Sequence, residues 1–250
     1  MLLHSLLVAA FLAFTFFPVP TKSDVKTAEI TGILAGHWPE TPACGNPRTE
    51  LSPLIVNLQH SSGGRGSGII IKPHKILTAA HVMSYSIDSY KIDGPGMNHP
   101  PNKRNAILGI QRNDSDDLAL LTIRTGETKP VKIADTPLEP FEKVWVIGIP
   151  LVYTNLVVEG RFQRIIPKGF NKWVESDTSF IAGFAAQGMS GGGVFRCRNS
   201  SYELAGVIRG VGISSAYNAA GPVTISVHTL MFATSQHVTK QFIDDHQVFQ

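Results

Sequence analysis

The sequence predicts an all-β barrel or sandwich that ends in one helix. Short apolar segments rich in β-branched residues follow one another at short intervals, which is typical of strands. The 23 glycines and 16 prolines supply turns between them. No long helical pattern alternates with the strands, which argues against parallel α/β architectures.

The expected strands fall into two sets that meet near residue 138. The first set covers 54–58, 68–71, 75–78, 105–111, 118–123 and 130–133. The second set covers 143–147, 156–164, 173–175, 193–196, 204–209 and 223–227. The segment from Thr229 to about Ile243 is expected to form the helix, with Thr229 as its N-cap.

Composition excludes several classes of function. Hydrophobic residues make up 43% of the 250 residues, which is enough for a buried core. The formal net charge is only +3, and no stripe of lysines and arginines appears, so we expect no nucleic-acid partner. The sequence holds no phosphate-binding loop, metal motif or cofactor fingerprint, so we expect no metal and no cofactor.

The N-terminus has the pattern of an export signal. Residues 2–17 are uncharged and almost all apolar, and a Pro18-Val19-Pro20 break follows. We expect a signal peptide over residues 1–23, cut after Ser23, and therefore a secreted or periplasmic protein. The alternatives are an uncleaved membrane anchor formed by residues 2–20 and a buried structural helix. Residues 24–50 are polar and turn-rich and are expected to form an N-terminal extension.

The two cysteines, Cys44 and Cys197, leave two alternatives open. They form one disulfide, or they are two buried free thiols. A structural zinc site is disfavoured because neither cysteine lies in a cluster of histidines and cysteines.

A glycine-rich segment surrounds a candidate nucleophile, Ser190. A serine hydroxyl needs a nearby base and donors for the developing oxyanion. In the sequence Gly188-Met189-Ser190-Gly191-Gly192, Gly188 can direct its N–H into the site, and with the N–H of Ser190 it would form an oxyanion hole. A glycine-rich hairpin with an incidental serine is the alternative.

Two further segments supply the partners that such a serine needs. His81 follows the small residues Thr78-Ala79-Ala80, which leave room around an imidazole. Asp117 opens an apolar strand, where its carboxylate could be buried against that imidazole. Asp114 and Asp116 are competing carboxylates, best explained as a solvated turn. The order His81, Asp117, Ser190 is one of the known arrangements of the catalytic triad and differs from that of α/β-hydrolases.

These segments together resemble the trypsin/chymotrypsin-like serine peptidases, and within them the compact bacterial Deg/HtrA-like protease domains without a PDZ module. The sequence segments that carry the resemblance include Gly66–Ile71, Ile76–Val82, Val146–Pro150 and Gly188–Gly193. The resemblance implies two six-stranded antiparallel β-barrels with a short C-terminal helix.

The resemblance also implies how the chain is divided. The first barrel, over residues 51–138, would carry His81 and Asp117, and the second, over 139–228, would carry Ser190. Residues 229–250 would form the helix and tail.

One departure from the relatives concerns activation. Digestive relatives carry an aspartate before the serine that pairs with a freshly cut N-terminus, whereas this chain has Met189. We therefore expect no activation by insertion of the N-terminus.

By the same analogy the substrate pocket would lie between 183–187, 208–211 and 224–226. The candidate residues there are Phe184, Gln187, Ile208, Arg209 and Gly210. Phe184 stands where trypsin-like specificity needs an aspartate, so small or medium apolar P1 residues are expected. Arg209 is expected to point to solvent, with a role in binding an acidic P1 residue as the alternative.

The sequence thus predicts an exported serine endopeptidase acting on proteins or peptides through His81, Asp117 and Ser190. A catalytically silent protein-binding relative and an esterase with the same triad are the alternatives.

Overall fold

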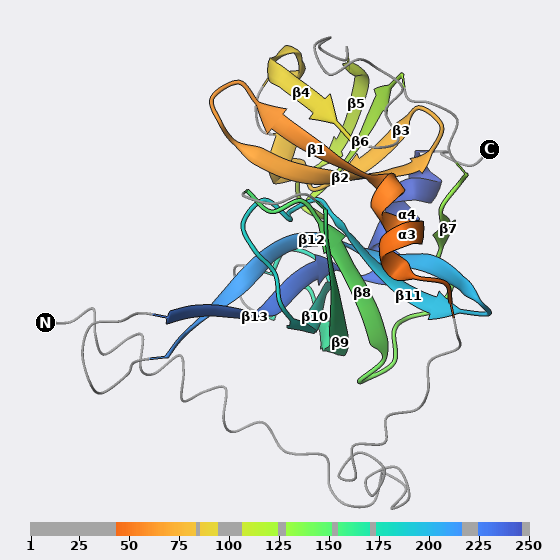
Figure 1. The fold of residues 1–250 in the computed structure, drawn as a ribbon, viewed down its shortest axis with the longest axis vertical. Helices are drawn as coiled ribbons and strands as arrows, with labels where there is room; N and C mark the ends of the chain where they lie inside the picture. Colours follow the sequence, from red (N-terminus) through yellow and green to blue (C-terminus); the bar gives the residue numbers. More distant parts are fainter. Residues whose placement is uncertain are drawn as a thin grey trace, which may run out of the picture. The chain divides into compact units, whose positions relative to one another are not determined.

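The computed structural model describes residues 44–83, 86–94, 107–124, 129–151, 155–170, 174–216 and 225–246, without the side chains of 212–216 and 225–230. The predicted signal peptide and most of the predicted extension lie outside the described residues. The described part is built of two antiparallel sheets and a C-terminal helix (Figure 1). The predicted all-β architecture is therefore confirmed.

The first sheet holds six strands in the order β4-β1-β2-β3-β6-β5. Their bounds are β1 Ile55–His60, β2 Arg65–Lys72, β3 Lys75–Thr78, β4 Tyr90–Asp93, β5 Ile107–Asn113 and β6 Leu118–Ile123. Each neighbour pair is antiparallel. Within the described residues β4 and β5 do not pair with each other, so this sheet is curled rather than closed.

The second sheet closes into a barrel, because β11 pairs with β8 at one end and with β12 at the other. Its strands are β8 Lys143–Gly148, β9 Leu156–Ile166, β10 Thr178–Gly183, β11 Gly193–Arg198, β12 Ser201–Ala216 and β13 Ile225–Thr234. A two-residue strand, β7 Lys132–Ile133, adds to β12 in parallel. This barrel has the predicted six strands, and β7 is an addition to it.

Apolar side chains explain why the two sheets stay together. One cluster fills the first sheet around residues such as Ile70 and Leu121, and another fills the second barrel around Phe162 and Ile181. A third cluster takes residues from both sheets and from the helix; it includes Ile69, Ile147, Phe195 and Phe242. Burial of this shared core fixes one sheet against the other.

The predicted C-terminal helix begins later than expected. Helix α4 spans Gln236–Asp245, with Ser235 at its N-cap position. The expected start at Thr229 is wrong, because residues up to Thr234 belong to β13. An apolar run of this length suits either a helix or a strand, and pairing with β10 along 178–182 decides for the strand. The second barrel therefore extends to residue 234 rather than 228.

Two strands were not predicted, and one predicted strand is not observed. β10 (Thr178–Gly183) and β4 (Tyr90–Asp93) carry weak apolar patterns, and partners on both sides of β10 hold it in the barrel. The expected strand at 173–175 is not found at Val174 or Glu175, and Trp173 lies outside the described residues.

The end of the predicted extension is fixed to the second barrel. Cys44 and Cys197 form a disulfide with an S–S distance of 1.98 Å, and the hydroxyl of Tyr202 donates to the carbonyl of Gly45 at 2.8 Å. Helix α3 (Pro47–Leu51) and the 3-10 turn η1 (Ser52–Leu54) follow, and Leu51 is buried in the shared core. The alternative of two free thiols does not hold in this structure.

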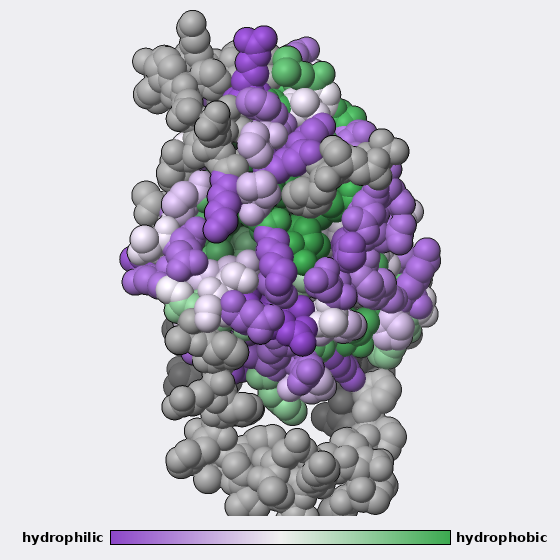
Figure 2. Space-filling model, turned by 90° about the vertical axis from the view of Figure 1, so that its right-hand side faces the viewer, coloured by the Kyte–Doolittle hydropathy of each residue, from purple (hydrophilic) through white to green (hydrophobic). Residues whose placement is uncertain are grey.

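On the face drawn in Figure 2, charged and polar residues predominate, and apolar residues gather near its middle. The large apolar side chains recorded as exposed are Leu108, Phe141, Phe170 and Phe184. Within the described residues no helix is long and apolar enough to span a bilayer.

Candidate active site

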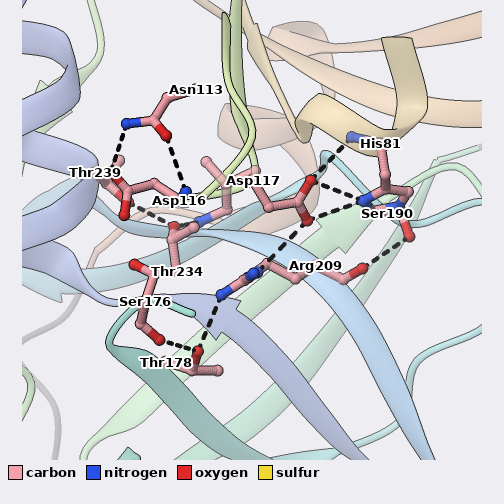
Figure 3. A network of polar contacts seen from close by, with 11 residues as sticks. His81, Asn113, Asp116, Asp117, Ser176, Thr178, Ser190, Arg209, Thr234 and Thr239 are labelled. Carbon is pink, nitrogen blue, oxygen red and sulfur yellow. Dashed lines mark hydrogen bonds and ion pairs between the residues drawn. The ribbon is translucent and has the colours of Figure 1, made fainter. Parts of the chain in front are cut away.

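The pairing of β3 with β6 brings His81 and Asp117 together. His81 lies in the 3-10 turn η2 (Ala80–Met83) directly after β3, and Asp117 immediately precedes β6. The imidazole Nδ1 lies 2.9 Å from Oδ2 and 3.0 Å from Oδ1 of Asp117, and the backbone N–H of His81 donates to Oδ1 at 2.9 Å (Figure 3). One carboxylate thus holds both the ring and the backbone of His81.

The other two aspartates of the turn have different partners. Asp116 accepts from the side-chain amide of Asn113 at 2.7 Å, and its own N–H donates to the Asn113 side-chain oxygen. Asp114 pairs with Arg112 at 2.5 Å. The turn gives Asp117 a φ of 53°, a left-handed conformation that aspartate and asparagine tolerate better than most residues. The turn therefore presents Asp117, and not its neighbours, to the imidazole.

The environment of Asp117 keeps its carboxylate ionised. Burial alone would raise the pKa of Asp117, but the hydrogen bond and charge of His81, the His81 backbone N–H and the charge of Arg209 outweigh it. The net pKa of Asp117 is therefore below its usual value. An ionised carboxylate here can stabilise a positive charge on the imidazole.

Ser190 lies in the turn before β11, against the first sheet. Its carbonyl accepts from the backbone N–H of Ser67 at 2.7 Å. A Cβ added at Gly66 would lie 2.4 Å from Val82, the neighbour of His81, and 3.2 Å from the Ser190 carbonyl oxygen, so these segments meet at Gly66. The Ser190 hydroxyl donates to the Arg209 carbonyl at 3.4 Å (Figure 3).

The loop before Ser190 turns the amide of Gly188 away from Leu151. The carbonyl of Gln187 accepts from the N–H of Leu151 at 3.0 Å. In a trans peptide the C=O and the next N–H point in opposite directions, so the N–H of Gly188 points away from Leu151. Gly188 has a φ of 96°, and a Cβ there would lie 2.8 Å from the Ile149 carbonyl oxygen, so both conformation and space require glycine. Among the described residues, neither the Gly188 nor the Ser190 N–H donates a backbone hydrogen bond.

Ser67, on β2, holds this loop from the first sheet. It is fully buried, and its hydroxyl donates to the Gly188 carbonyl at 2.9 Å and accepts from the N–H of Ile149 at 2.8 Å. Its carbonyl accepts from the Thr78 hydroxyl at 2.7 Å. Met189 is also fully buried, in the core of the second barrel. An apolar side chain and neutral hydrogen bonds thus hold the loop at the position where digestive relatives place an ion pair.

If the Gly188 amide binds an oxyanion, as the resemblance implies, replacing Ser67 with Ala should lower kcat by up to about 10²-fold with a smaller change in KM, because a small displacement of that amide weakens oxyanion binding. The two buried groups left without a partner should also cost about 1–3 kcal/mol of unfolding free energy. Steady-state kinetics on a peptide substrate and urea unfolding measure both effects. The matched control is Ser201→Ala, whose hydroxyl bonds Arg198 at the surface. A kcat equal to that of the control would contradict this role for Ser67.

The residues predicted to line the substrate pocket are only partly available to a substrate. Phe184 and Gln187 are exposed, and Gly210 is half-buried. Ile208 is 1% exposed and packs in the core of the second barrel, so its side chain does not line an open pocket. Arg209 takes neither predicted orientation: its side chain is turned to Asp117 and Thr178. Thr224, in the third predicted wall, lies outside the described residues.

Sequence reasoning missed Ser67 as a residue of this site and named Arg209 only as a candidate for the substrate pocket. In the sequence Ser67 stands out only as part of the Gly66–Ile71 match, and its contacts with Gly188 join residues 121 positions apart. The contact of Arg209 with Asp117 carries no local signal in the sequence. Among the described residues, no group of three or more histidine, cysteine, aspartate or glutamate side chains is placed to hold a metal ion.

Comparisons with known proteins identify the family and the fold. The family model for a trypsin-like peptidase domain matches residues 66–206. No curated protein matches the chain. Among solved structures, the active form of the Rv3671c protease from M. tuberculosis is similar with a TM-score of 0.62 and 19% identity, covering 85% of this chain and 94% of that one. The inactive form of the Rv3671c protease has a TM-score of 0.58 and 18% identity, covering 82% and 98%. These likenesses confirm the predicted chymotrypsin-like fold.

Proposed function

Because the chain belongs to the trypsin-like peptidase family, we propose that it is a serine endopeptidase that cleaves proteins or peptides through His81, Asp117 and Ser190. The observation that carries the proposal is the pair of contacts between the Asp117 carboxylate and His81, at Nδ1 and at the backbone N–H. Since Asp117 binds the Nδ1 side of the ring, Nε2 is the nitrogen that would act as a base toward Ser190.

The proposed reaction runs in two halves. The Ser190 Oγ attacks the scissile carbonyl while the Nε2 of His81 takes its proton, and the N–H groups of Gly188 and Ser190 bind the oxyanion. The C–N bond then breaks as the imidazolium gives its proton to the leaving amine, and an acyl-enzyme remains. Water attacks the acyl carbon while His81 takes its proton. The C–O bond to Ser190 then breaks, the imidazolium returns the proton to Ser190 Oγ, and the carboxylic acid product leaves. Asp117 keeps its charge throughout and stabilises the imidazolium.

The buried Met189 supports a further part of the proposal, that the site needs no activation by a cut N-terminus. Its side chain is fully buried among apolar residues, and the Gly188 N–H already points away from Leu151. The loop that carries Gly188 and Ser190 is thus arranged without an ion pair.

Export is proposed as well. Disulfides persist mainly in oxidising compartments, and the bond between Cys44 and Cys197 supports a secreted or periplasmic location. N-terminal sequencing of the exported protein would show whether residues 1–23 are removed; a protein that retains them would favour the membrane anchor.

A fluorophosphonate probe tests the enzyme. We expect it to label the wild-type protein and to leave Ser190→Ala unlabelled, because the probe reacts only with an activated serine. Ser67→Ala should be labelled more slowly, and Ser201→Ala at the wild-type rate. A folded wild-type protein that is not labelled would favour the silent binding module. Labelling together with cleavage of esters but not of peptides would favour the esterase.

A further inference from the structure

Arg209 contacts both ends of the proposed triad. Its Nε lies 3.5 Å from Oδ2 of Asp117, and its carbonyl accepts from the Ser190 hydroxyl at 3.4 Å. Figure 3 shows the side chain passing beneath Asp117 and the carbonyl facing Ser190. The Arg209 side chain is only 18% exposed, so its charge is partly shielded from solvent.

A break in strand register explains the direction of this side chain. In the pairing of β12 with β13, Ile208 lies opposite Ala233 and Gly210 lies opposite Phe232, so Arg209 is the extra residue of a β-bulge. A bulge bends its strand and redirects the side chain at that point. The alternation expected for a regular strand therefore does not apply to Arg209, and its side chain turns toward Asp117.

Thr178, the first residue of β10, fixes the far end of the guanidinium. Arg209 Nη1 donates to the Thr178 hydroxyl at 3.1 Å, and that hydroxyl donates to the Ser176 carbonyl at 2.8 Å. Thr178 is 6% exposed. The guanidinium is thus held at two points and does not reach into solvent as most surface arginines do.

The other charged groups around Asp117 are already paired. On the β5–β6 turn, Asp114 pairs with Arg112, and Asp116 is bonded to Asn113. On the side of Thr178, Asp177 pairs with His237 of α4 at 2.9 Å. Within the described residues, Arg209 supplies the one guanidinium or ammonium group that contacts Asp117.

We propose that Arg209 is a positioning residue. Its fixed positive charge beside Asp117 sets the pH at which activity falls on the acidic side of the pH–activity profile. The inference rests on the proposed peptidase function. A positive charge that shares the Asp117 carboxylate opposes the arrival of a second positive charge on His81. Protonation of the neutral imidazole removes the general base, so this charge keeps the base available at lower pH.

The pH dependence of kcat/KM tests the proposal. The acid limb of this profile is the range in which kcat/KM falls as pH is lowered. In Arg209→Met, which removes the charge, the acid limb should move to higher pH by about 0.5–1 unit. Arg209→Lys keeps a charge and should stay closer to the wild-type limb. Thr178→Val loosens the guanidinium and should give a smaller shift in the same direction. The matched control is Arg161→Met, whose half-buried guanidinium pairs with Glu159, and its limb should not move.

Two results would overturn the proposal. In a folded Arg209→Met protein, the acid limb could stay in place while the maximum kcat/KM falls. That result would make Arg209 a structural residue. A limb that stays in place while KM rises selectively for peptides with an acidic P1 residue would assign Arg209 to substrate binding. Either result leaves the peptidase function standing.

A measurement without catalysis separates this proposal from the function on which it rests. In the Ser190→Ala protein, the Nδ1 proton between His81 and Asp117 can be followed by NMR as pH is varied. Its titration midpoint should rise when Arg209→Met is added. A rise in midpoint, in a protein whose wild type proves inactive, would support the electrostatic role while the peptidase function fails. An unchanged midpoint would overturn the role of Arg209.

Discussion

If the proposed triad operates, replacing Asp117 with Asn should lower kcat by about 10⁴-fold while the protein stays folded, because a neutral amide neither fixes the required tautomer of His81 nor stabilises the imidazolium. Asparagine is the informative substitution at this position. The φ of 53° at residue 117 is tolerated by asparagine, so the turn keeps its conformation. The loss of activity can then be assigned to the lost charge and not to a displaced backbone.

Steady-state kinetics of the Asp117→Asn protein on a peptide substrate measures this loss, with thermal unfolding to check the fold. The matched control is Asp116→Asn on the same turn, because that carboxylate is bonded to Asn113 and not to the imidazole. We expect the control to keep most of its activity. Equal losses in the two variants would show that the turn, rather than the Asp117 charge, supports activity.

Replacing Glu203 with Gln should lower the free energy of unfolding by about 3–5 kcal/mol, because it leaves a buried cation without its counter-ion. Arg196 is 2% exposed, and its Nε and Nη2 donate to the Glu203 carboxylate at 2.9 and 2.8 Å. Lys132 of β7 pairs with the same carboxylate. Arg196 also donates to the Pro137 carbonyl and the Thr136 hydroxyl. The pair therefore fastens the segment between the two sheets to the second barrel.

Urea unfolding of a double variant tests whether the lost charge pairing causes this effect. Arg196→Met with Glu203→Leu removes both charges and should be much closer to the wild type than Glu203→Gln alone. The surface pair of Lys240 and Asp244 provides the control: Asp244→Asn should leave the urea midpoint in place. A double variant as unstable as the single one would mean that packing, and not charge, accounts for the loss.

The same carboxylate gives stability a pH dependence. Burial alone would raise the pKa of Glu203, but hydrogen bonds and charges from Lys132 and Arg196 outweigh it, so the net pKa is lowered. A lowered pKa in the folded state stabilises the fold above the pKa of the unfolded chain. That contribution is lost as pH falls through the folded-state pKa, and this loss should be missing from urea titrations of Glu203→Gln.

Much of the fold was predictable because its signals are local. β3 and β6 have the predicted bounds, since each is a short, almost continuously buried and mainly apolar run. The three segments around His81, Asp117 and Ser190 were also recognisable, because small residues precede His81, an apolar strand follows Asp117, and glycines surround Ser190. β10 and the end of β13 were missed because their conformation depends on partners distant in sequence.

The sequence by itself determined the class of fold, the candidate triad and the expected role of the glycine at position 188. Only the tertiary structure decided which aspartate reaches His81, that Ser67 holds the loop before Ser190, and that Arg209 faces Asp117. The physical reason is the separation along the chain over which each interaction acts. Apolar periodicity and glycine conformation act between neighbours in the chain, whereas these contacts depend on strand register, on a bulge in β12 and on burial between the two sheets.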